Sequence, residues 1–189
     1  MGWAAAFLGA RAVASADGGV STVGAVVSKP APKPHVHGPN GVTSLPEHRP
    51  IAWKMDVLDG PAFDLSAYRG KVVFINIFAT WCGPCNSEQP AVVTFAEAHP
   101  DDTVVVGMNY EEYDDKVRAY RKKFDIPYPI AMDRQGKILR GVYIGQKMAF
   151  PMTIVFRRDG TLSCAWEGDA NLAWFESERE AALADLSAS

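Results

Sequence analysis

The sequence has few cysteines, no long apolar run and no concentration of positive charge, and each absence excludes a class of protein. Three cysteines in 189 residues are too few for a small scaffold held together by disulfides. No stretch approaches the roughly 18 consecutive apolar residues that span a bilayer. The formal net charge is −3 and no basic run contains interleaved aromatic residues, so we predict no nucleic-acid partner.

The overall composition is that of a globular protein. Hydrophobic residues make up 48% of the chain and charged residues 22%, close to the averages for soluble domains. A wholly disordered or fibrous chain is therefore excluded. A length of 189 residues leaves room for one domain and an appendage.

Residues 1–16 resemble the second half of a secretory signal. A short apolar segment leads to Ala14-Ser15-Ala16, a pattern of small residues that signal peptidase cleaves after. No Lys or Arg precedes the apolar segment. We interpret it as a truncated signal peptide or the remnant of a membrane tether, and an Ala-rich disordered tail is the alternative.

Residues 17–45 have the composition of a linker. Gly, Ser, Val and Pro dominate without sustained periodicity, and the Lys29–Pro34 stretch, with proline at every second position, favours an extended polyproline conformation. His35 and His37 lie on one side of an extended segment, but two imidazoles do not complete a metal site. The folded domain is predicted over residues 46–189.

After residue 46 the hydrophobic pattern alternates between strands and helices, which indicates an α/β fold with a mixed sheet. The run 71–78 is apolar almost throughout, as in a strand buried on both faces. Helices are predicted at 87–99, 112–124, 136–143 and 172–186. Strands are predicted at 51–58, 62–65, 71–78, 102–109, 128–132, 152–156 and 161–167, the first two and the last two as hairpins.

Cys82 and Cys85 lie where the buried strand gives way to a helix. Their i, i+3 spacing brings them to about 5–6 Å on one helix face, within the range of a disulfide. The unpaired N–H groups and the dipole of a helix N-terminus favour the thiolate of the first cysteine. Pro84 is tolerated in the first turn. We therefore predict that Cys82 is the nucleophile and Cys85 the resolving thiol.

This pair predicts thiol–disulfide exchange, which needs no cofactor. Cys82 attacks a substrate disulfide, and Cys85 then attacks Cys82 to release reduced substrate. Zinc would require two more ligands, and the other cysteine in the chain is Cys164, so we predict no metal site. Two other functions stay open: a thiol peroxidase that uses Cys82, and a chaperone-like module that binds Cu(I) through both thiolates.

The run Trp81-Cys82-Gly83-Pro84-Cys85 resembles the active site of the thioredoxin superfamily. From about residue 51 onward the chain is similar to the TlpA/ResA/CcmG-like branch, in which Asn76 replaces a buried Asp and Glu88 follows the first cysteine by six positions. The resemblance implies a three-layer sandwich with a mixed central sheet flanked by helices. It also implies an N-terminal β-hairpin extension and a helix-containing insertion at about 109–132.

The resemblance and its position in the sequence make Glu88 a candidate catalytic residue. It is i+3 from Cys85, and partial burial would raise its pKa toward a useful value. Asn76 cannot exchange protons, so we expect Glu88 to accept the proton of Cys85. A simple surface glutamate is the alternative.

The dipeptide Phe150-Pro151 resembles the cis-proline loop of the superfamily and gives the predicted substrate-binding residues. A cis peptide costs little only before proline. It would hold the backbone of Phe150 extended beside Cys82, ready to pair with a substrate strand. Phe150 is bulkier than the residue usual at this place in the family. Trp81 is predicted to form the opposite wall of the groove, or else to pack on the domain.

The resemblance implies a reductant of protein disulfides in the periplasm or elsewhere outside the cytoplasm, in cytochrome c maturation or copper-site assembly. An upstream electron donor in the membrane would supply it through a thiol relay. The remaining candidates receive structural interpretations. We predict that Cys164 is packed in a strand. The acidic residues at 111, 112, 114 and 115 are predicted to be solvated at a helix start, where the dipole favours them.

Overall fold

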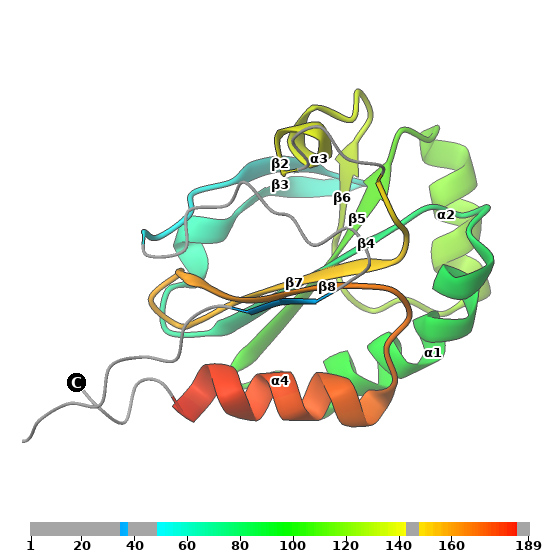
Figure 1. Ribbon diagram of the computed structural model, residues 1–189. Helices are drawn as coiled ribbons and strands as arrows, with labels where there is room; N and C mark the ends of the chain where they lie inside the picture. Colours follow the sequence, from blue (N-terminus) through cyan, green and yellow to red (C-terminus); the bar gives the residue numbers. More distant parts are fainter. Residues whose placement is uncertain (1–34, 38–48, 143–147, 185–189) are drawn as a thin grey trace, which may run out of the picture.

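The computed structural model describes residues 35–37, 49–142 and 148–184 (Figure 1). The helices are α1 (Gly83–Ala98), α2 (Asp114–Lys123), α3 (Lys137–Val142) and α4 (Leu172–Ala184), with a short 3-10 helix η1 (Leu65–Tyr68). The strands are β1 (His35–His37), β2 (Lys54–Val57), β3 (Gly60–Asp64), β4 (Val72–Phe78), β5 (Thr103–Tyr110), β6 (Ile130–Asp133), β7 (Met152–Phe156) and β8 (Leu162–Glu167). In the described part of the chain they form one mixed sheet in the order β1-β8-β7-β4-β5-β6-β2-β3. The predicted α/β class is confirmed.

β4 lies in the interior of the sheet and carries the candidate site at its end. It pairs in parallel with β5 and antiparallel with β7, and all of its residues are buried. Alternate side chains enter different cores: Phe74 and Phe78 pack with α1 and α4, whereas Ile75 and Ile77 pack on the opposite face. The nearly continuous apolar run arises because both faces of this strand are covered.

Side chains of α1, α2 and α4 are buried on one face of the sheet and those of α3 and η1 on the other, giving three layers (Figure 1). The rings of Phe74 and Phe95 lie 4.8 Å apart, and those of Phe95 and Phe175 lie 5.4 Å apart, linking β4, α1 and α4. Leu65 of η1 and Leu139 of α3 are buried on the opposite face. Burying each phenylalanine contributes about 1.5–3 kcal/mol, so the aromatic contacts hold α1 firmly against the sheet.

α1 begins at Gly83, earlier than the predicted start at residue 87. Cys82 caps the helix with an extended backbone, and Pro84 follows in the first turn, where an N–H has no partner within the helix. Pro90 lies inside the helix, and the Thr94 hydroxyl donates to its carbonyl at 3.0 Å. Both cysteines therefore lie at the helix N-terminus, as the predicted thiol–disulfide exchange requires.

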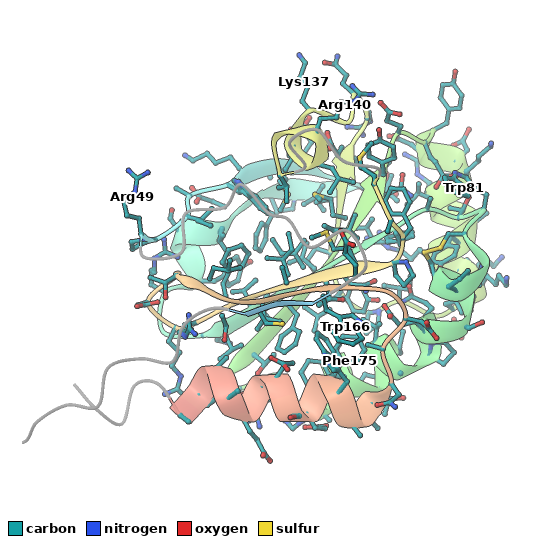
Figure 2. The ribbon with its side chains drawn as sticks, viewed as in Figure 1. Arg49, Trp81, Lys137, Arg140, Trp166 and Phe175 are labelled. Atoms are coloured by element: carbon teal, nitrogen blue, oxygen red, sulfur yellow. A yellow bond between two sulfur atoms is a disulfide. The ribbon has the colours of Figure 1, made fainter. Side chains whose placement is uncertain are left out.

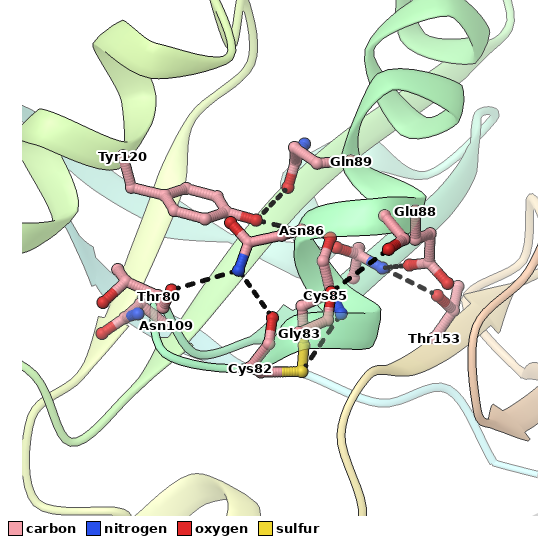
Figure 3. Close-up of a disulfide and its surroundings, with 12 residues drawn as sticks. Thr80, Cys82, Gly83, Cys85, Asn86, Glu88, Gln89, Asn109, Tyr120 and Thr153 are labelled. Carbon is pink, nitrogen blue, oxygen red and sulfur yellow. Dashed lines mark hydrogen bonds between the residues drawn. A yellow bond between two sulfur atoms is a disulfide. The ribbon is translucent and has the colours of Figure 1, made fainter.

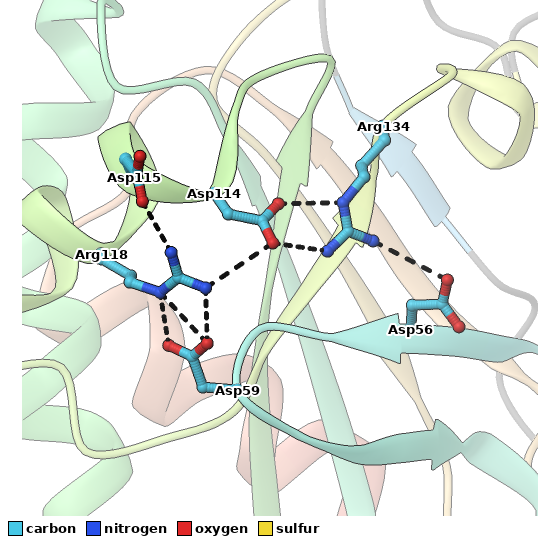
Figure 4. A network of polar contacts seen from close by, with 6 residues as sticks. All are labelled: Asp56, Asp59, Asp114, Asp115, Arg118 and Arg134. Atoms are coloured by element: carbon cyan, nitrogen blue, oxygen red, sulfur yellow. Dashed lines mark hydrogen bonds and ion pairs between the residues drawn. The ribbon is translucent and has the colours of Figure 1, made fainter.

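Arginines tie the β2–β3 hairpin to the insertion that contains α2 (Figure 4). Arg118 of α2 binds Asp59 of the hairpin turn at 2.7 Å and Asp115 at 2.7 Å. Arg134 after β6 binds Asp114 at 2.9 Å. Asp59 has a φ of 56°, a left-handed conformation that Asp tolerates. Because these groups are partly exposed, the network fixes orientation more than it adds stability.

The short strand β1 lies inside the segment that the sequence predicts to be a linker. Its backbone pairs in parallel with β8, with His35 opposite Cys164 and His37 opposite Trp166. The sequence predicts a linker over residues 17–45, and within it these three residues pair with the edge of β8, which would otherwise lack a partner on that side. The signal-like segment at 1–16 lies outside the described residues. Across the ranges that are described, no helix is both long and apolar enough to cross a membrane.

Candidate active site

The end of β4 and the start of α1 bring the two cysteines together. Cys82 and Cys85 form a disulfide with a Cα–Cα distance of 5.3 Å, within the separation that their spacing predicts (Figure 3). The exposed fractions are only 4% for Cys82 and 2% for Cys85. The backbone N–H of Cys85 donates to the Cys82 sulfur at 3.1 Å. In the reduced form, this donor and the helix dipole favour a thiolate at Cys82.

Asn86 holds the turn around the first cysteine. Its side-chain amide donates to the carbonyl of Cys82 at 2.7 Å and to the carbonyl of Thr80 at 3.3 Å (Figure 3). Lys123 of α2 donates to the amide oxygen of Asn86 at 3.3 Å. One side chain thus fixes the backbone on both sides of Trp81.

Glu112 anchors the same turn from the insertion. Its carboxylate accepts from the N–H of Thr80 at 2.6 Å, from the Thr80 hydroxyl at 2.5 Å and from the side-chain amide of Asn109 at 2.8 Å. The prediction of a solvated acid is therefore wrong for Glu112, which is buried. Its position before α2 directs it toward the active-site turn, where buried donors need an acceptor.

Glu88 lies one turn beyond Cys85 and is buried, with an exposed fraction of 4%. One carboxylate oxygen accepts from the Asn76 amide and the other from the N–H of Ala170, each at 2.6 Å. Burial raises the pKa of Glu88 to about 7, and the hydrogen bonds from Ala170 and Asn76 offset only part of this increase. The charge of Asp169 raises the pKa further. Glu88 is not a simple surface glutamate.

Trp81 and Phe150 meet beside the cysteine pair. The indole of Trp81 is 68% exposed and stands at the edge of the molecule (Figure 2). Its ring centroid lies 5.9 Å from that of Phe150 in an edge-to-face contact. Phe150 also lies 5.3 Å from Tyr110, and the Phe150–Pro151 peptide is cis, as predicted. The structure thus joins the two predicted substrate-binding aromatic residues into one surface.

A second buried group of polar side chains supports α1 from the insertion. The Tyr120 hydroxyl lies 3.4 Å from the Cys85 carbonyl and 3.3 Å from the side-chain oxygen of Gln89. The amide of Gln89 donates to the hydroxyl of Tyr128. Burial raises the pKa of both tyrosines, and the charge of Glu88 adds to this shift. Both hydroxyls are neutral at physiological pH and act as structural partners.

Cys164 lies apart from this chemistry, in the interior of β8 opposite Val155. Burial raises the pKa of its thiol, and the charge of Glu178 adds to the increase. A buried neutral thiol fits the predicted packing role. Over residues 49–142 and 148–184, no three His, Cys, Asp or Glu side chains gather as a metal site would require.

The Redoxin family profile matches residues 43–178, most of the chain. The chain belongs to the Redoxin family. It is 30% identical over 113 residues to the thioredoxin-like protein YneN of Bacillus subtilis, a match that covers 58% of this chain and 64% of that relative. It is 32% identical over 104 residues to the thiol-disulfide oxidoreductase ResA of Geobacillus kaustophilus, covering 54% of this chain and 58% of ResA. The chain thus spans about three fifths of the length of these curated relatives.

Solved structures of related proteins share the fold of this Redoxin family member. A thiol:disulfide interchange protein from Chlorobium tepidum matches with a TM-score of 0.64 and 27% identity, over 72% of this chain and 99% of that chain. StoA from Bacillus subtilis matches with a TM-score of 0.58 and 20% identity, over 70% of this chain and 98% of StoA, which shows the fold alone. The predicted resemblance to the TlpA/ResA/CcmG-like branch of the thioredoxin superfamily is confirmed.

Sequence reasoning found the cysteines but missed several side chains that position them. Asn86 directly follows Cys85. An asparagine near a helix start commonly hydrogen-bonds to nearby backbone groups, so its role could be predicted from the sequence. Thr153 lies two residues after Pro151 and accepts from Asn76 at 3.1 Å. Tyr120 lies within the helix predicted at 112–124. Its contact with the Cys85 carbonyl joins segments 35 residues apart, which no local pattern indicates.

Proposed function

We propose that this chain is a thiol-disulfide oxidoreductase that reduces disulfides in protein substrates. The observation that carries the proposal is the Cys82–Cys85 disulfide at the N-terminus of α1, beside the exposed ring of Trp81. The names of relatives support it, since both ResA and the Chlorobium tepidum protein are described by thiol–disulfide chemistry. The exchange needs no cofactor.

The reaction moves two electrons from the cysteine pair to the client. The Cys82 thiolate attacks one sulfur of a client disulfide, the client S–S bond breaks, and the departing client thiolate takes up a proton. Cys85 then loses its proton and attacks the Cys82 sulfur. The Cys82–Cys85 bond forms, and the second client thiolate leaves. The pair ends in the oxidised state seen in Figure 3.

Glu88 accepts the proton that Cys85 releases in the second step. A carboxylate whose pKa is about 7 is substantially ionised at neutral pH and can both take up and return a proton. Glu88 is also held by hydrogen bonds to both oxygens, so its carboxylate does not turn away into solvent. Asn76, its neighbour, offers hydrogen bonds without titrating.

Trp81, Phe150 and Pro151 form the surface that receives the client. The edge-to-face contact of Trp81 with Phe150 supplies an apolar surface next to Cys82. The backbone of Phe150, immediately before the cis-proline, pairs with an extended client segment around its cysteine. Aromatic rings contribute contact area at low entropic cost.

The site of action is the periplasm or another compartment outside the cytoplasm, where disulfides persist. The signal-like residues at 1–16 support export or a membrane tether, and one structural relative is described as a secreted disulfide oxidoreductase of Mycobacterium tuberculosis. A dithiol donor in the membrane restores the reduced pair. Clients are proteins of cytochrome c maturation or copper-site assembly.

A Cys85→Ser variant tests the assignment of the two thiols. Without the resolving thiol, clients stay bound to Cys82 as mixed disulfides, which gel electrophoresis without reductant detects and mass spectrometry identifies. A variant with both Cys82→Ser and Cys85→Ser is the matched control and should trap nothing. The proposal fails if Cys85→Ser captures no more protein than this control and the wild type does not reduce insulin disulfides.

The same preparation separates the two rival functions. A peroxidase would consume peroxide rapidly with a thiol donor while leaving insulin intact. A copper module would bind one Cu(I) tightly through Cys82 and Cys85 and show no reductase activity. Either result would replace the proposed activity.

A Glu88→Gln variant tests the proton acceptor. The amide keeps the shape but accepts no proton, so resolution of the mixed disulfide at pH 7 should slow about 100-fold, the low end of general-base effects. Rapid-quench measurement of client release gives this rate. Asp169→Asn is the control, because it removes a neighbouring charge and leaves the Glu88 carboxylate in place. An unchanged rate in Glu88→Gln would remove Glu88 from the mechanism.

A further inference from the structure

Hydrogen bonds join three buried polar side chains, from Thr153 of β7 through Asn76 of β4 to Glu88 of α1, and Figure 3 shows the two ends of this line. Thr153 of β7 lies opposite Asn76 of β4 in the sheet register. The Asn76 amide nitrogen lies 3.1 Å from the Thr153 hydroxyl oxygen and 2.6 Å from a carboxylate oxygen of Glu88. Thr153 is 1% exposed and Asn76 2%, so water competes little for these bonds.

The line has a direction because an amide is not symmetric. The nitrogen of Asn76 carries two N–H donors, and its oxygen carries none. In the observed orientation one N–H reaches Glu88 and the other reaches Thr153, so both donors are used. With the amide reversed, its oxygen would face the carboxylate. That contact is repulsive when Glu88 is ionised and favourable only when Glu88 is protonated.

Thr153 therefore influences which charge state of Glu88 the protein prefers. When its hydroxyl accepts the second N–H, the orientation that suits the ionised carboxylate leaves no donor unpaired. Without the hydroxyl, that orientation would strand a buried N–H, which is costly. The orientation that suits ionised Glu88 then loses part of its advantage over the reversed orientation, which suits protonated Glu88.

Other groups around Glu88 do not perform this task. The N–H of Ala170, from the loop between β8 and α4, binds the other carboxylate oxygen. Asp169 in that loop adds a negative charge, and Tyr120 and Tyr128 from the insertion are neutral near pH 7. Cys85 is in the disulfide on the same helix. None of these groups is a side-chain amide that can present either a donor or an acceptor to Glu88, as Asn76 can.

We propose that Thr153 is a positioning residue that holds the amide nitrogen of Asn76 toward Glu88 and thereby keeps Glu88 ready to accept a proton. The inference rests on the proposed function for its importance in turnover. Its structural content, the effect of Thr153 on the protonation of Glu88, holds independently of any substrate.

Thr153→Val and Thr153→Ser provide the test. Valine keeps the shape and removes the hydroxyl, whereas serine keeps the hydroxyl. In the full chain, oxidised and labelled with ¹³C at glutamate carboxyl groups, NMR titration follows Glu88, whose signal Glu88→Gln identifies. We expect the titration midpoint to rise by about one pH unit in Thr153→Val, a tenfold increase in proton affinity. The titration midpoint of Glu88 in Thr153→Ser should stay within about 0.3 pH unit of the wild-type midpoint.

The results distinguish this inference from the proposed function. Equal midpoints in wild type and Thr153→Val would overturn the role of Thr153, whatever the activity. If the midpoint moves while the pH profile of client release does not, Thr153 keeps its role and Glu88 loses its place in the mechanism. Urea unfolding at pH 7 checks that both variants fold. If Thr153→Val does not fold, Thr153→Ala removes the same hydroxyl without adding volume. An unchanged Glu88 titration midpoint in Thr153→Ala would then overturn the role of Thr153.

Discussion

Replacing Glu112 with alanine is expected to destabilise the turn that carries the cysteine pair. The change removes the acceptor for the backbone N–H and hydroxyl of Thr80 and for the amide of Asn109. A buried donor without a partner costs about 1–3 kcal/mol. The Thr80 hydroxyl can turn toward water because Thr80 is only half-buried, so two such losses remain, together about 3 kcal/mol. With a slope of about 2 kcal/mol per molar urea, the unfolding midpoint should fall by about 1.5 M.

Glu112→Gln and Glu111→Gln make the measurement specific. Glutamine keeps one acceptor oxygen at residue 112, so Glu112→Gln should lower the free energy of unfolding by only about 1–2 kcal/mol. Glu111 is the adjacent carboxylate and pairs with Arg140 at the surface, where the loss should stay below about 1 kcal/mol. All variants are compared by urea unfolding of the oxidised protein. The reasoning is refuted if Glu112→Ala and Glu111→Gln have midpoints within 0.3 M of each other, a gap worth roughly 0.6 kcal/mol.

Three further predictions concern pH, the third thiol and the core. The pKa of Glu88 rises from 4.5 in the unfolded chain to about 7 in the folded protein, so the folded protein binds a proton more tightly. Protonation of Glu88 therefore adds to the free energy of unfolding. This contribution is complete below pH 4.5 and is lost as the pH rises through 7. Urea unfolding of the wild type should show a free energy of unfolding that is lower at pH 8 than at pH 4.5 by up to about 3 kcal/mol, and Glu88→Gln should lack this decrease. Equal pH dependence in the two proteins would contradict the prediction. A thiol reagent should find no reactive cysteine in the native oxidised protein and only Cys164 after unfolding, because that thiol is buried; rapid labelling of the native state would be inconsistent with the structure. Phe95→Ala opens a cavity between β4, α1 and α4 and should cost about 3–5 kcal/mol in calorimetry, whereas a loss under about 1 kcal/mol would mean that the aromatic cluster is not a core.

Local chemistry explains why much of the site could be predicted from the sequence. The spacing of Cys82 and Cys85 fixes their separation on any helix, and the apolar run before them specifies a buried strand. Pro151 allows a cis peptide that other residues disfavour. These properties belong to a few neighbouring residues, so they can be inferred without knowing where the rest of the chain lies.

Boundaries and partners depended on packing that no local pattern records. α1 begins at Gly83 because Cys82 caps it, whereas the apolar periodicity begins only later. β1 forms in a segment of linker composition because β8 offers a free edge. Residues at such positions have no strong preference of their own, and tertiary contacts decide their structure.

The sequence by itself determined that two thiols lie at a helix N-terminus and that the chain folds as an α/β domain, because periodicity and spacing act over a few residues. Only the tertiary structure decided which groups surround those thiols. Glu112 and Thr153 reach the site from segments distant in sequence. Their effect comes from burial, which turns ordinary side chains into partners that set protonation and hold a turn in place.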